Sequence, residues 1–451
     1  MVTAEHPVQG SNGSTVTPGP HPAPSRSAED LAAQTSGTGR YVTGRVPGHE
    51  LLSQPALKLA RLLYGLPDLR PVRAQDESFA RWRSAGDPLA DALVARIKNG
   101  GGQQLRVQFE QALTDGVGSV EGAPEELVTF FQAVENVPYW IDPEKLERGS
   151  RVYQSVGADI MPVFAMGLAM SYLAEDANQV LLRSGDLHRK AARRAVETLT
   201  WVGEVTSPGA LYPGEDGYRA AVRVRLTHGF MRSGIGQTPG WPESELPIHQ
   251  GVYVATPILF SVMTIALSLA HGHFMTRRDR GAVLHLWRYV ACLVGVAPEL
   301  IAADEADQWR LAAVQMNHQI RLDDVTRASG RELGGALLRA YPDLFGLDPR
   351  NPREARTLNR VTAANTLIMH LLLGEKAATT LGFDNPRLSA LLPVLRHAAV
   401  NVLRRAAAYA VPGGRRRFED RQRAAAREVL VAAGLRVQAD LTYHRAGGAD
   451  S

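Results

Sequence analysis

The chain has 451 residues, which suffice for one large domain or two of medium size. Charged residues account for 21% of it and apolar residues for 45%, as in an ordinary soluble globular protein. The formal net charge of +4 is too small and too scattered for a nucleic-acid-binding footprint, so we expect no nucleic-acid partner. Cys292 is the only cysteine, which excludes an internal disulfide and cysteine-rich zinc or iron–sulfur sites.

The two ends of the chain are predicted to lie outside the folded domain. Residues 1–34 are rich in Pro, Gly, Ser and Thr, and we place a disordered N-terminal tail over residues 1–45. This stretch offers neither the basic start nor the apolar core of a secretory leader, so we expect a cytoplasmic protein. A frayed tail is predicted over residues 441–451, which leaves residues 46–440 as a single all-helical domain.

Helical periodicity runs through the whole of this domain, beginning near His49. Asp142 is expected to cap a helix, because Pro143 follows it at the first helical position. Asp186 is expected to cap a second helix that runs to about Val205. Alternating strand patterns with hairpin turns are nearly absent, so the fold class is all-α. Further helices are predicted over residues 76–98, 103–114, 124–133, 278–296, 304–341, 354–381, 387–411 and 415–434.

One segment is apolar enough to raise the question of a membrane. From Gly251 to Gly272 the chain carries no Asp, Glu, Lys or Arg, and this length can cross a bilayer. Pro257 and several Ser and Thr residues make the segment only moderately apolar, however, and no basic flank precedes it. A helix buried on all sides of a large helical domain explains it more simply, so we expect no stable membrane span.

The segment AVRVRLTHGFMR, residues 221–232, carries the most informative cluster of polar residues. Arg225, His228 and Arg232 stand at i, i+3 and i+7, which places their directions within about 60° of one another on a helix. A haem provides one reason for this arrangement, since imidazole is a common iron ligand and arginines pair with the two propionates. The alternative is a buried histidine between two arginines that serve ordinary carboxylates elsewhere in the chain.

A second helical face precedes it by about thirty residues. Arg194, Glu197 and Thr198 stand at i, i+3 and i+4, so a cation, an acid and a hydroxyl share one face. This face fits the opposite wall of a cofactor pocket. It fits equally well a solvated surface with a local salt bridge.

Four other histidines are also possible metal ligands. His271 and His273 form a His-Gly-His pair after the uncharged segment, a spacing that suits copper or zinc, but no third ligand is evident. We therefore expect surface residues at a helix end. His318 and His370 lie in apolar-periodic helices and are expected in the core or at its boundary.

Five blocks follow one another between about residues 130 and 310. They are Arg193-Arg194 with Glu197-Thr198 and Trp201; the loop PGALYPGEDGY from Pro208 to Tyr218; Val224-Arg225 with His228 and Arg232; Trp241 with Pro247-Ile248-His249-Gln250; and Leu286-Trp287-Arg288-Tyr289 with Leu293-Val294-Gly295. In this order and at this spacing, the blocks resemble the latex clearing protein (rubber oxygenase) superfamily.

The resemblance implies a globin-like helical core with additional flanking helices and one bound haem b. It implies that His228 is the axial iron ligand, that Arg225 and Arg232 frame this histidine, and that Arg194 and Thr198 line the haem pocket. It also implies dioxygen-dependent cleavage of an isoprenoid C=C bond. The iron would keep a position open for dioxygen, and the protein would position the substrate and exclude water.

Two departures from the family pattern shape the functional hypothesis. Glu197 stands where rubber-cleaving members have a lysine, and no secretion leader is visible. Rubber itself is therefore not the expected substrate. Glu197 is assigned either an acid–base role with a raised pKa or a structural ion pair with Arg193 or Arg194.

We accordingly predict a haem b-dependent oxygenase that uses dioxygen to oxidise or cleave a C=C bond in an intracellular apolar metabolite, terpenoid- or polyketide-like. The catalytic residues would be Glu197, Arg194 and Thr198, and the cofactor would be held by His228, Arg225 and Arg232. Two alternatives stay open: a non-catalytic haem protein for gas or redox sensing or ligand storage, and a cofactor-free helical scaffold.

Overall fold

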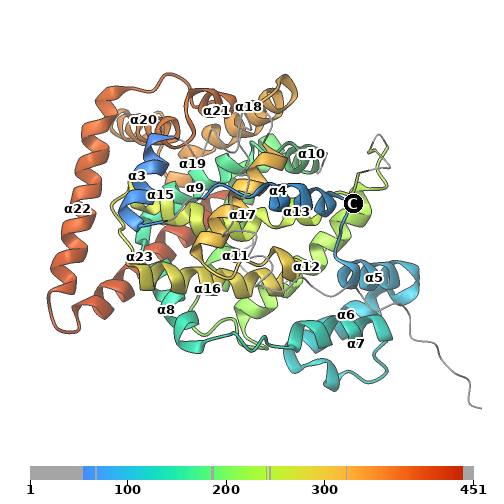
Figure 1. Ribbon diagram of the computed structural model, residues 1–451. Helices are drawn as coiled ribbons and strands as arrows, with labels where there is room; N and C mark the ends of the chain where they lie inside the picture. The colour runs from blue at the N-terminus through green and yellow to red at the C-terminus, as the bar shows by residue number, and fades with distance from the viewer. Residues whose placement is uncertain are drawn as a thin grey trace, which may run out of the picture. The chain divides into compact units, whose positions relative to one another are not determined.

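The computed structural model describes residues 54–66, 69–183, 187–239, 241–242, 245–320 and 322–439. The regular elements in these ranges are helices (Figure 1). In addition, Ala174 and Ile320 form an isolated antiparallel bridge. The all-α prediction is therefore confirmed. By internal contacts the chain divides into residues 1–40 and 41–451, and every described helix belongs to the second unit. The predicted tails, 1–45 and 441–451, fall outside the described residues, as does the predicted cap Asp186.

The first helices are shorter than the sequence pattern predicts. The prediction of one continuous helix over residues 76–98 is wrong, because Gly86-Asp87-Pro88 divides it. Asp87 caps the second part by accepting a hydrogen bond from the amide of Ala90 at 3.3 Å. Asp142 caps its helix as predicted, accepting from the amides of Glu144 and Lys145. The elements here are α3 (Pro55–Tyr64), α4 (Arg73–Phe79), η1 (Ala80–Arg83), α5 (Pro88–Arg96), η2 (Ile97–Gly101), α6 (Gly102–Asp115), η3 (Val117–Ser119), α7 (Glu125–Glu135) and α8 (Pro143–Gln154).

The uncharged segment in the middle of the chain forms a buried but interrupted helix. Pro257 cannot donate a backbone hydrogen bond, and a π-helical turn follows it at η5 (Leu259–Met263). Residues Gln250–Ala270 are long and apolar enough to cross a membrane, yet 72% of the apolar window lies inside the protein, as expected of a core helix. The elements of this region are η4 (Gly157–Asp159), α9 (Ile160–Ser171), α10 (Glu175–Arg183), α11 (Leu187–Val205), α12 (Asp216–Ile235), α13 (Gln250–Tyr253), α14 (Ala255–Ile258), α15 (Thr264–Ala270) and α16 (Arg277–Leu293).

The remaining helices complete the fold. The predicted helix 304–341 is divided near residue 320, and the predicted helix 354–381 ends earlier, where Gly374 adopts a positive φ of 79°. The elements are η6 (Pro298–Leu300), α17 (Glu305–Gln319), α18 (Asp324–Arg339), α19 (Tyr341–Phe345), α20 (Pro352–Leu373), α21 (Glu375–Thr380), η7 (Leu388–Ala390), α22 (Leu391–Tyr409) and α23 (Gly414–Val437).

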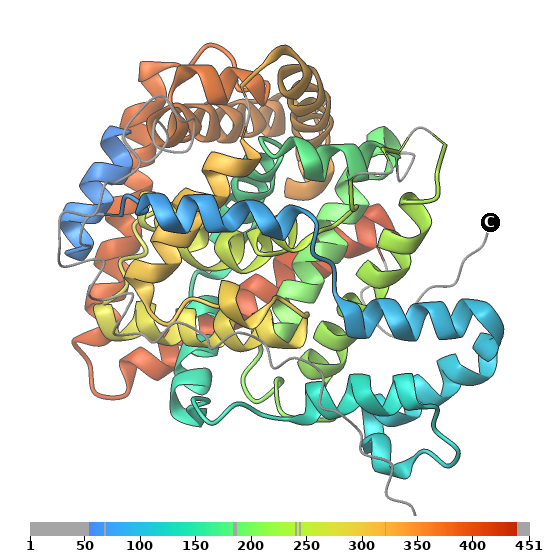
Figure 2. The ribbon, with the colours of Figure 1, turned by 45° about the vertical axis from the view of Figure 1, so that its right-hand side comes forward.

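Helix α12 is the element around which the candidate site is built. It packs against α5, α11 and α16, and α11 in turn packs against α9, α18 and α23. Figures 1 and 2 both place α5, α6 and α7 together on one side of the described helices and α22 on the opposite side. One continuous hydrophobic core extends from Leu57 in α3 to Ala433 in α23.

Candidate functional site

Arg225 of α12 is paired with the residue that caps α5. Its Nε lies 2.7 Å from Asp87 Oδ2 and its Nη2 lies 2.9 Å from Asp87 Oδ1, and both side chains are buried. Burial alone would lower the pKa of Arg225, but the hydrogen bond and charge of Asp87 raise it above its usual value. The guanidinium also lies 5.0 Å from the ring of Phe130 in α7. This two-point ion pair fixes α12 against α5.

Arg232 repeats this arrangement two turns later. Its Nε lies 2.8 Å from Asp91 Oδ1, and its Nη1 donates to the carbonyl of Ile248 at 3.0 Å. Ile248 has a φ of 50°, which is unusual for a β-branched residue and turns this carbonyl toward the arginine. Arg225 and Arg232, seven residues apart on α12, therefore pair with two aspartates four residues apart at the start of α5. This is the arrangement that the sequence left open as an alternative to haem propionates.

Two glycines cover the ion pairs closely. Gly295 has a φ of 89°, and a Cβ there would collide with Asp87 Oδ2 and Arg225 Nε. A Cβ on Gly86 would come within 2.8 Å of Asp91 Oδ2. The side chain of Gln250 ties both glycines together, because its Nε2 donates to the carbonyls of Gly86 at 3.0 Å and Gly295 at 2.9 Å. Segments remote in sequence thus close over one charged cluster, in which Asp91 alone is substantially exposed.

His228 lies between Arg225 and Arg232 on α12. These arginines pair with aspartates, whereas the Nδ1 of His228 is buried and makes no hydrogen bond to any described residue. The residue as a whole is partly exposed. Its ring meets the edge of Tyr253 in α13 at 4.9 Å, and the Tyr253 hydroxyl is likewise buried without a hydrogen bond. Burial, and secondarily the charge of Arg232, lower the pKa of His228 to about 4. The imidazole is therefore neutral at neutral pH.

Glu197 and Thr198 of α11 each bond to a residue of the same helix. Glu197 Oε1 lies 2.6 Å from Arg193 Nε, with both side chains partly exposed. Thr198 Oγ1 donates to the carbonyl of Arg194 at 2.8 Å. Arg194 lies close enough to the buried hydroxyl of Tyr172 to oppose the rise in its pKa that burial causes. The structure thus places Glu197 in the ion pair that the sequence analysis gave as its alternative role.

An aromatic cluster joins α11 to α16 and η5. The ring of Phe260 stacks against Trp287 at 5.1 Å, and Trp201 lies 6.0 Å from each of them. Both indole Nε1 atoms are buried without a hydrogen-bond partner. Buried donors left unpaired are costly, so the two indoles and His228 mark places where a ligand would supply missing interactions.

The residues present fit a haem in part. A histidine that serves as axial ligand must be neutral and have a free ring nitrogen, and His228 meets both conditions. Within the described ranges, no three His, Cys, Asp or Glu side chains gather to hold a metal ion, so an iron would depend on a macrocycle. Arg225 and Arg232 fit less directly, because propionates would have to share them with Asp87 and Asp91.

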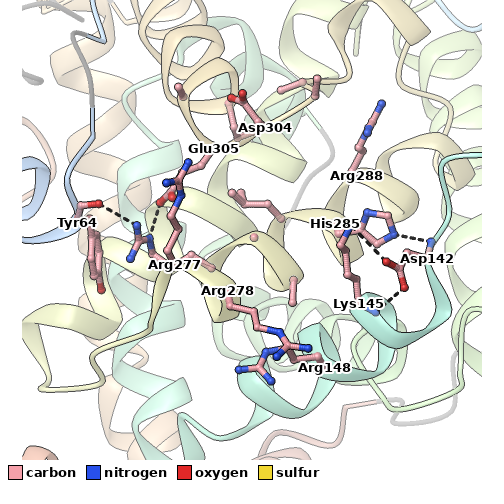
Figure 3. A pocket seen from close by; sticks show the side chains of 18 of the residues that line it. Tyr64, Asp142, Lys145, Arg148, Arg277, Arg278, His285, Arg288, Asp304 and Glu305 are labelled. Carbon is pink, nitrogen blue, oxygen red and sulfur yellow. Dashed lines mark hydrogen bonds and ion pairs between the residues drawn. The ribbon is translucent and has the colours of Figure 1, made fainter.

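One cavity lies near this site, and a second lies apart from α11 and α12. The nearer one, of about 80 Å³, is walled almost entirely by apolar side chains, most of them from α9, α13, α14, η5 and α17, including Val252, the neighbour of Tyr253. The larger one, of about 860 Å³, has no lining residue from α11 or α12. Its lining mixes cations and acids: Arg277, Arg278 and Arg288 stand apart around it, and Arg148 lies beside Arg278 (Figure 3). Because it has no wall from α11 or α12, the larger cavity is not the site we favour.

The expectation for His271 and His273 is corrected by the structure. Both are buried, with exposed fractions of 7% and 2%, rather than at the surface. His273 Nε2 lies 2.8 Å from Asp159 Oδ2, and His271 Nδ1 bonds the carbonyl of Leu267 at 3.0 Å. His273 thus contacts η4, whereas the ring of His271 bonds back to α15, and these contacts explain a histidine pair without a metal. His318 and His370 lie at the boundary of the core, as predicted.

Three residues of the site were missed from the sequence. Asp87 and Asp91 complete the ion pairs, and Tyr253 covers His228. The Asp87-Pro88 pair is a helix-start signal that would have located α5. Nothing local indicates that its acids face arginines more than 130 residues away, since only tertiary packing brings them together.

Comparison with known proteins supports the resemblance to rubber oxygenases. A rubber oxygenase of a Streptomyces species is 23% identical over 231 residues, 49% of this chain and 55% of that protein, so the chain spans about half its length. The structure of latex clearing protein in the closed state matches with a TM-score of 0.57 at 20% identity, over 78% of this chain and 91% of the other. Residues 154–409, more than half of the chain, match the family described as ER-bound oxygenase mpaB/B'/Rubber oxygenase, catalytic domain. The chain therefore belongs to this oxygenase family.

Proposed function

We propose that this protein is a haem b-dependent oxygenase that uses dioxygen to oxidise or cleave a C=C bond in an apolar metabolite. Family membership supports an oxygenase, and the names of the matched proteins point to C=C bonds. The observation that carries the cofactor assignment is His228, a partly exposed residue whose Nδ1 is buried without a hydrogen-bond partner among the described residues and whose lowered pKa keeps the imidazole neutral. We extend the proposal to an intracellular, cytoplasmic protein whose substrate is terpenoid- or polyketide-like.

The residues around His228 have distinct parts in this proposal. His228 would supply the axial nitrogen, and Tyr253 would limit the orientation of its ring. Arg225 and Arg232 would offer positive charge to propionates while Asp87 and Asp91 hold them in place. When bound, haem b supplies the iron at which dioxygen is activated, chemistry that no side chain of this site can perform.

The surroundings of the site favour an apolar substrate. The small cavity beside Val252 is lined by side chains such as Met170, Leu259 and Met316. Trp201, Phe260 and Trp287 add an aromatic wall between α11 and α16. Such surfaces exclude water and accept alkenes in preference to charged compounds. Arg194 and Thr198 would provide polar groups at the edge of this region.

One alternative has its own support. Because Arg225, Arg232 and Glu197 all have protein partners, a helical scaffold without cofactor would leave none of these charges unpaired. A haem protein for sensing or storage would share the cofactor and lack turnover. Measuring the haem content distinguishes the cofactor-free scaffold from the two haem-binding hypotheses. Measuring oxygen uptake in the presence of a short isoprenoid alkene then distinguishes the oxygenase from a sensing or storage protein.

The first prediction is that the protein, produced with adequate haem, shows a Soret band and about one iron per chain. Replacement of His228 by Ala should abolish or severely weaken haem retention while far-ultraviolet circular dichroism keeps its helical form. His271→Ala is the matched control, since His271 is also buried with a lowered pKa but has a hydrogen-bond partner. A folded, colourless wild-type protein would overturn the haem assignment, and an unchanged spectrum in the His228 variant would exclude His228 as ligand.

A further inference from the structure

Helix α22 attaches to the rest of the protein through polar side chains. Asn401 Nδ2 donates to Asp159 Oδ2 at 2.7 Å and to the carbonyl of His271 at 2.9 Å. His397 Nε2 lies 3.0 Å from the same carboxylate, and Arg405 Nη2 donates to the carbonyl of Ser155 at 3.3 Å. The inward face of α22 is therefore the polar one.

The opposite face of α22 is apolar and exposed. Leu392, Leu395, Val402 and Leu403 are 75%, 57%, 45% and 66% exposed, and Leu388 in the preceding turn is 80% exposed. Leu392, Leu395 and Val402 stand at i, i+3 and i+10, with Leu403 beside them, so they form one stripe along the helix. A surface helix normally turns its apolar stripe inward, and this helix does the reverse.

The exposed apolar surface continues onto α3. Phe274, 46% exposed, joins the two helices, because its ring lies 5.5 Å from Tyr64 of α3 and its carbonyl accepts a hydrogen bond from Arg405 of α22. Both views place α3 beside α22 (Figures 1 and 2). Its apolar residues Leu59, Leu62 and Leu63 are 55%, 79% and 51% exposed. A patch of this extent on a monomer marks an interaction surface.

The charge around this surface has one sign. Residues 385–418 contain seven arginines and no Asp or Glu, and α3 also lacks an acidic residue. Among the described residues, exposed Arg396 and Arg404 on α22 have no acidic partner, nor do exposed Arg387 and Lys58 nearby. Leucine and valine on one face with arginines along its edges is the pattern of a helix that lies in a membrane interface.

We propose that α22, with α3 and Phe274, docks this protein onto the surface of an anionic lipid bilayer. The apolar stripe would enter the headgroup region, and the arginines at its edges would meet lipid phosphates. A second copy of the chain is a poorer occupant, because a pair of such faces would bring unpaired arginines against one another. This docking surface is distinct from the buried helix Gln250–Ala270, and the inference does not rest on haem or catalysis.

Co-sedimentation of the full chain with vesicles tests the proposal. The protein should bind vesicles of phosphatidylcholine mixed with phosphatidylglycerol, bind phosphatidylcholine alone at least about tenfold less, and release with salt. Leu392→Glu with Leu403→Glu should weaken binding to the mixed vesicles by at least about tenfold. Arg396→Gln with Arg404→Gln should lower it by about thirtyfold, since each arginine near an anionic surface contributes roughly 1 kcal/mol and about 1.4 kcal/mol corresponds to tenfold.

Matched controls use the same substitutions elsewhere. Val325→Glu changes a residue of α18 that is 60% exposed, and Arg81→Gln removes an exposed cation of η1 that lies over Trp82. Both should bind vesicles like the wild type, and all variants should keep the wild-type circular dichroism. Absence of vesicle binding, or equal binding to both lipid compositions, would overturn the proposal. A concentration-dependent dimer that the Leu392 and Leu403 changes abolish would overturn it in favour of a second copy.

Discussion

Asp87 performs two tasks at the start of α5. Its carboxylate accepts the hydrogen bond of the Ala90 amide, and it holds the buried guanidinium of Arg225 at two points. A buried ion pair does not by itself add much stability, because both charges lose their hydration. Removing one partner is costly, however, since the other charge stays buried and unpaired. The pair therefore fixes how α12 sits against α5 more than it stabilises the fold.

The prediction at this scale is that Asp87→Asn lowers the free energy of unfolding by about 3–5 kcal/mol. Asparagine is as good an N-cap as aspartate, so the loss reports the unpaired Arg225 and not the cap. Urea unfolding followed by circular dichroism measures it. Asp324→Asn is the control: this acid pairs with Arg327 on the surface, where such a pair contributes about 1 kcal/mol or less. Equal losses in the two variants would contradict the buried-pair argument.

At the scale of elements, two side chains of α22 converge on a single carboxylate of η4. Asp159 accepts hydrogen bonds from His397 and Asn401 of α22 and from His273. The hydrogen bond to Asp159 raises the pKa of His397, although partial burial and the charge of Arg404 oppose the rise. A group whose folded pKa is raised stabilises the folded state fully below its unfolded pKa of about 6.5, and this contribution is lost as pH rises through the folded pKa.

We therefore expect the stabilisation that His397 provides to be larger at about pH 6 than at about pH 9. Subtracting the free energy of unfolding of His397→Gln from that of the wild type at each pH isolates it. His370→Gln provides the comparison, because that imidazole bonds the backbone carbonyl of Phe383 and no carboxylate. A His397 contribution that stays constant or grows with pH would show that Asp159 does not hold a protonated imidazole.

The sequence predicts helices well where their ends carry local signals. The cap at Asp142 and the end of α11 near Val205 were predicted, because capping and periodicity are local properties. The break at Gly86-Asp87-Pro88 was overlooked, as was the π-helical turn after Pro257. The inverted polarity of α22 was not foreseen, since periodicity shows that a stripe exists but not which way it faces.

The candidate site was only partly predictable for the same reason. The helical spacing of Arg225, His228 and Arg232 predicted that one helix carries all three, and α12 does, with both arginines buried and His228 partly exposed. The partners of those arginines lie on α5, and the cover of His228 comes from α13. Such contacts span 138 and 141 residues for the ion pairs, so no local pattern encodes them.

At the scale of the whole molecule, the described helices share one core, and the candidate site lies inside it. The α12–α5 ion pairs, the closure by Gly86 and Gly295, and the aromatic wall of Trp201 belong to helices spread over half of the chain. A ligand that binds only the folded protein increases the free energy of unfolding of the entire domain. Haem should therefore act on global stability and not only on the surroundings of His228.

We expect haem loading to raise the melting temperature of the protein by a few degrees, since free ligand at a hundredfold excess over Kd adds about 2.7 kcal/mol. Differential scanning calorimetry of haem-loaded and haem-free protein measures the shift. His228→Ala should lose this gain, because the axial bond is gone, whereas His370→Gln should keep it. If the haem-free protein melted at the same temperature as the loaded one, the helical scaffold without cofactor would be the better account. If the His228 variant kept the full gain, haem would bind elsewhere in the fold, and the unpartnered imidazole would need another explanation.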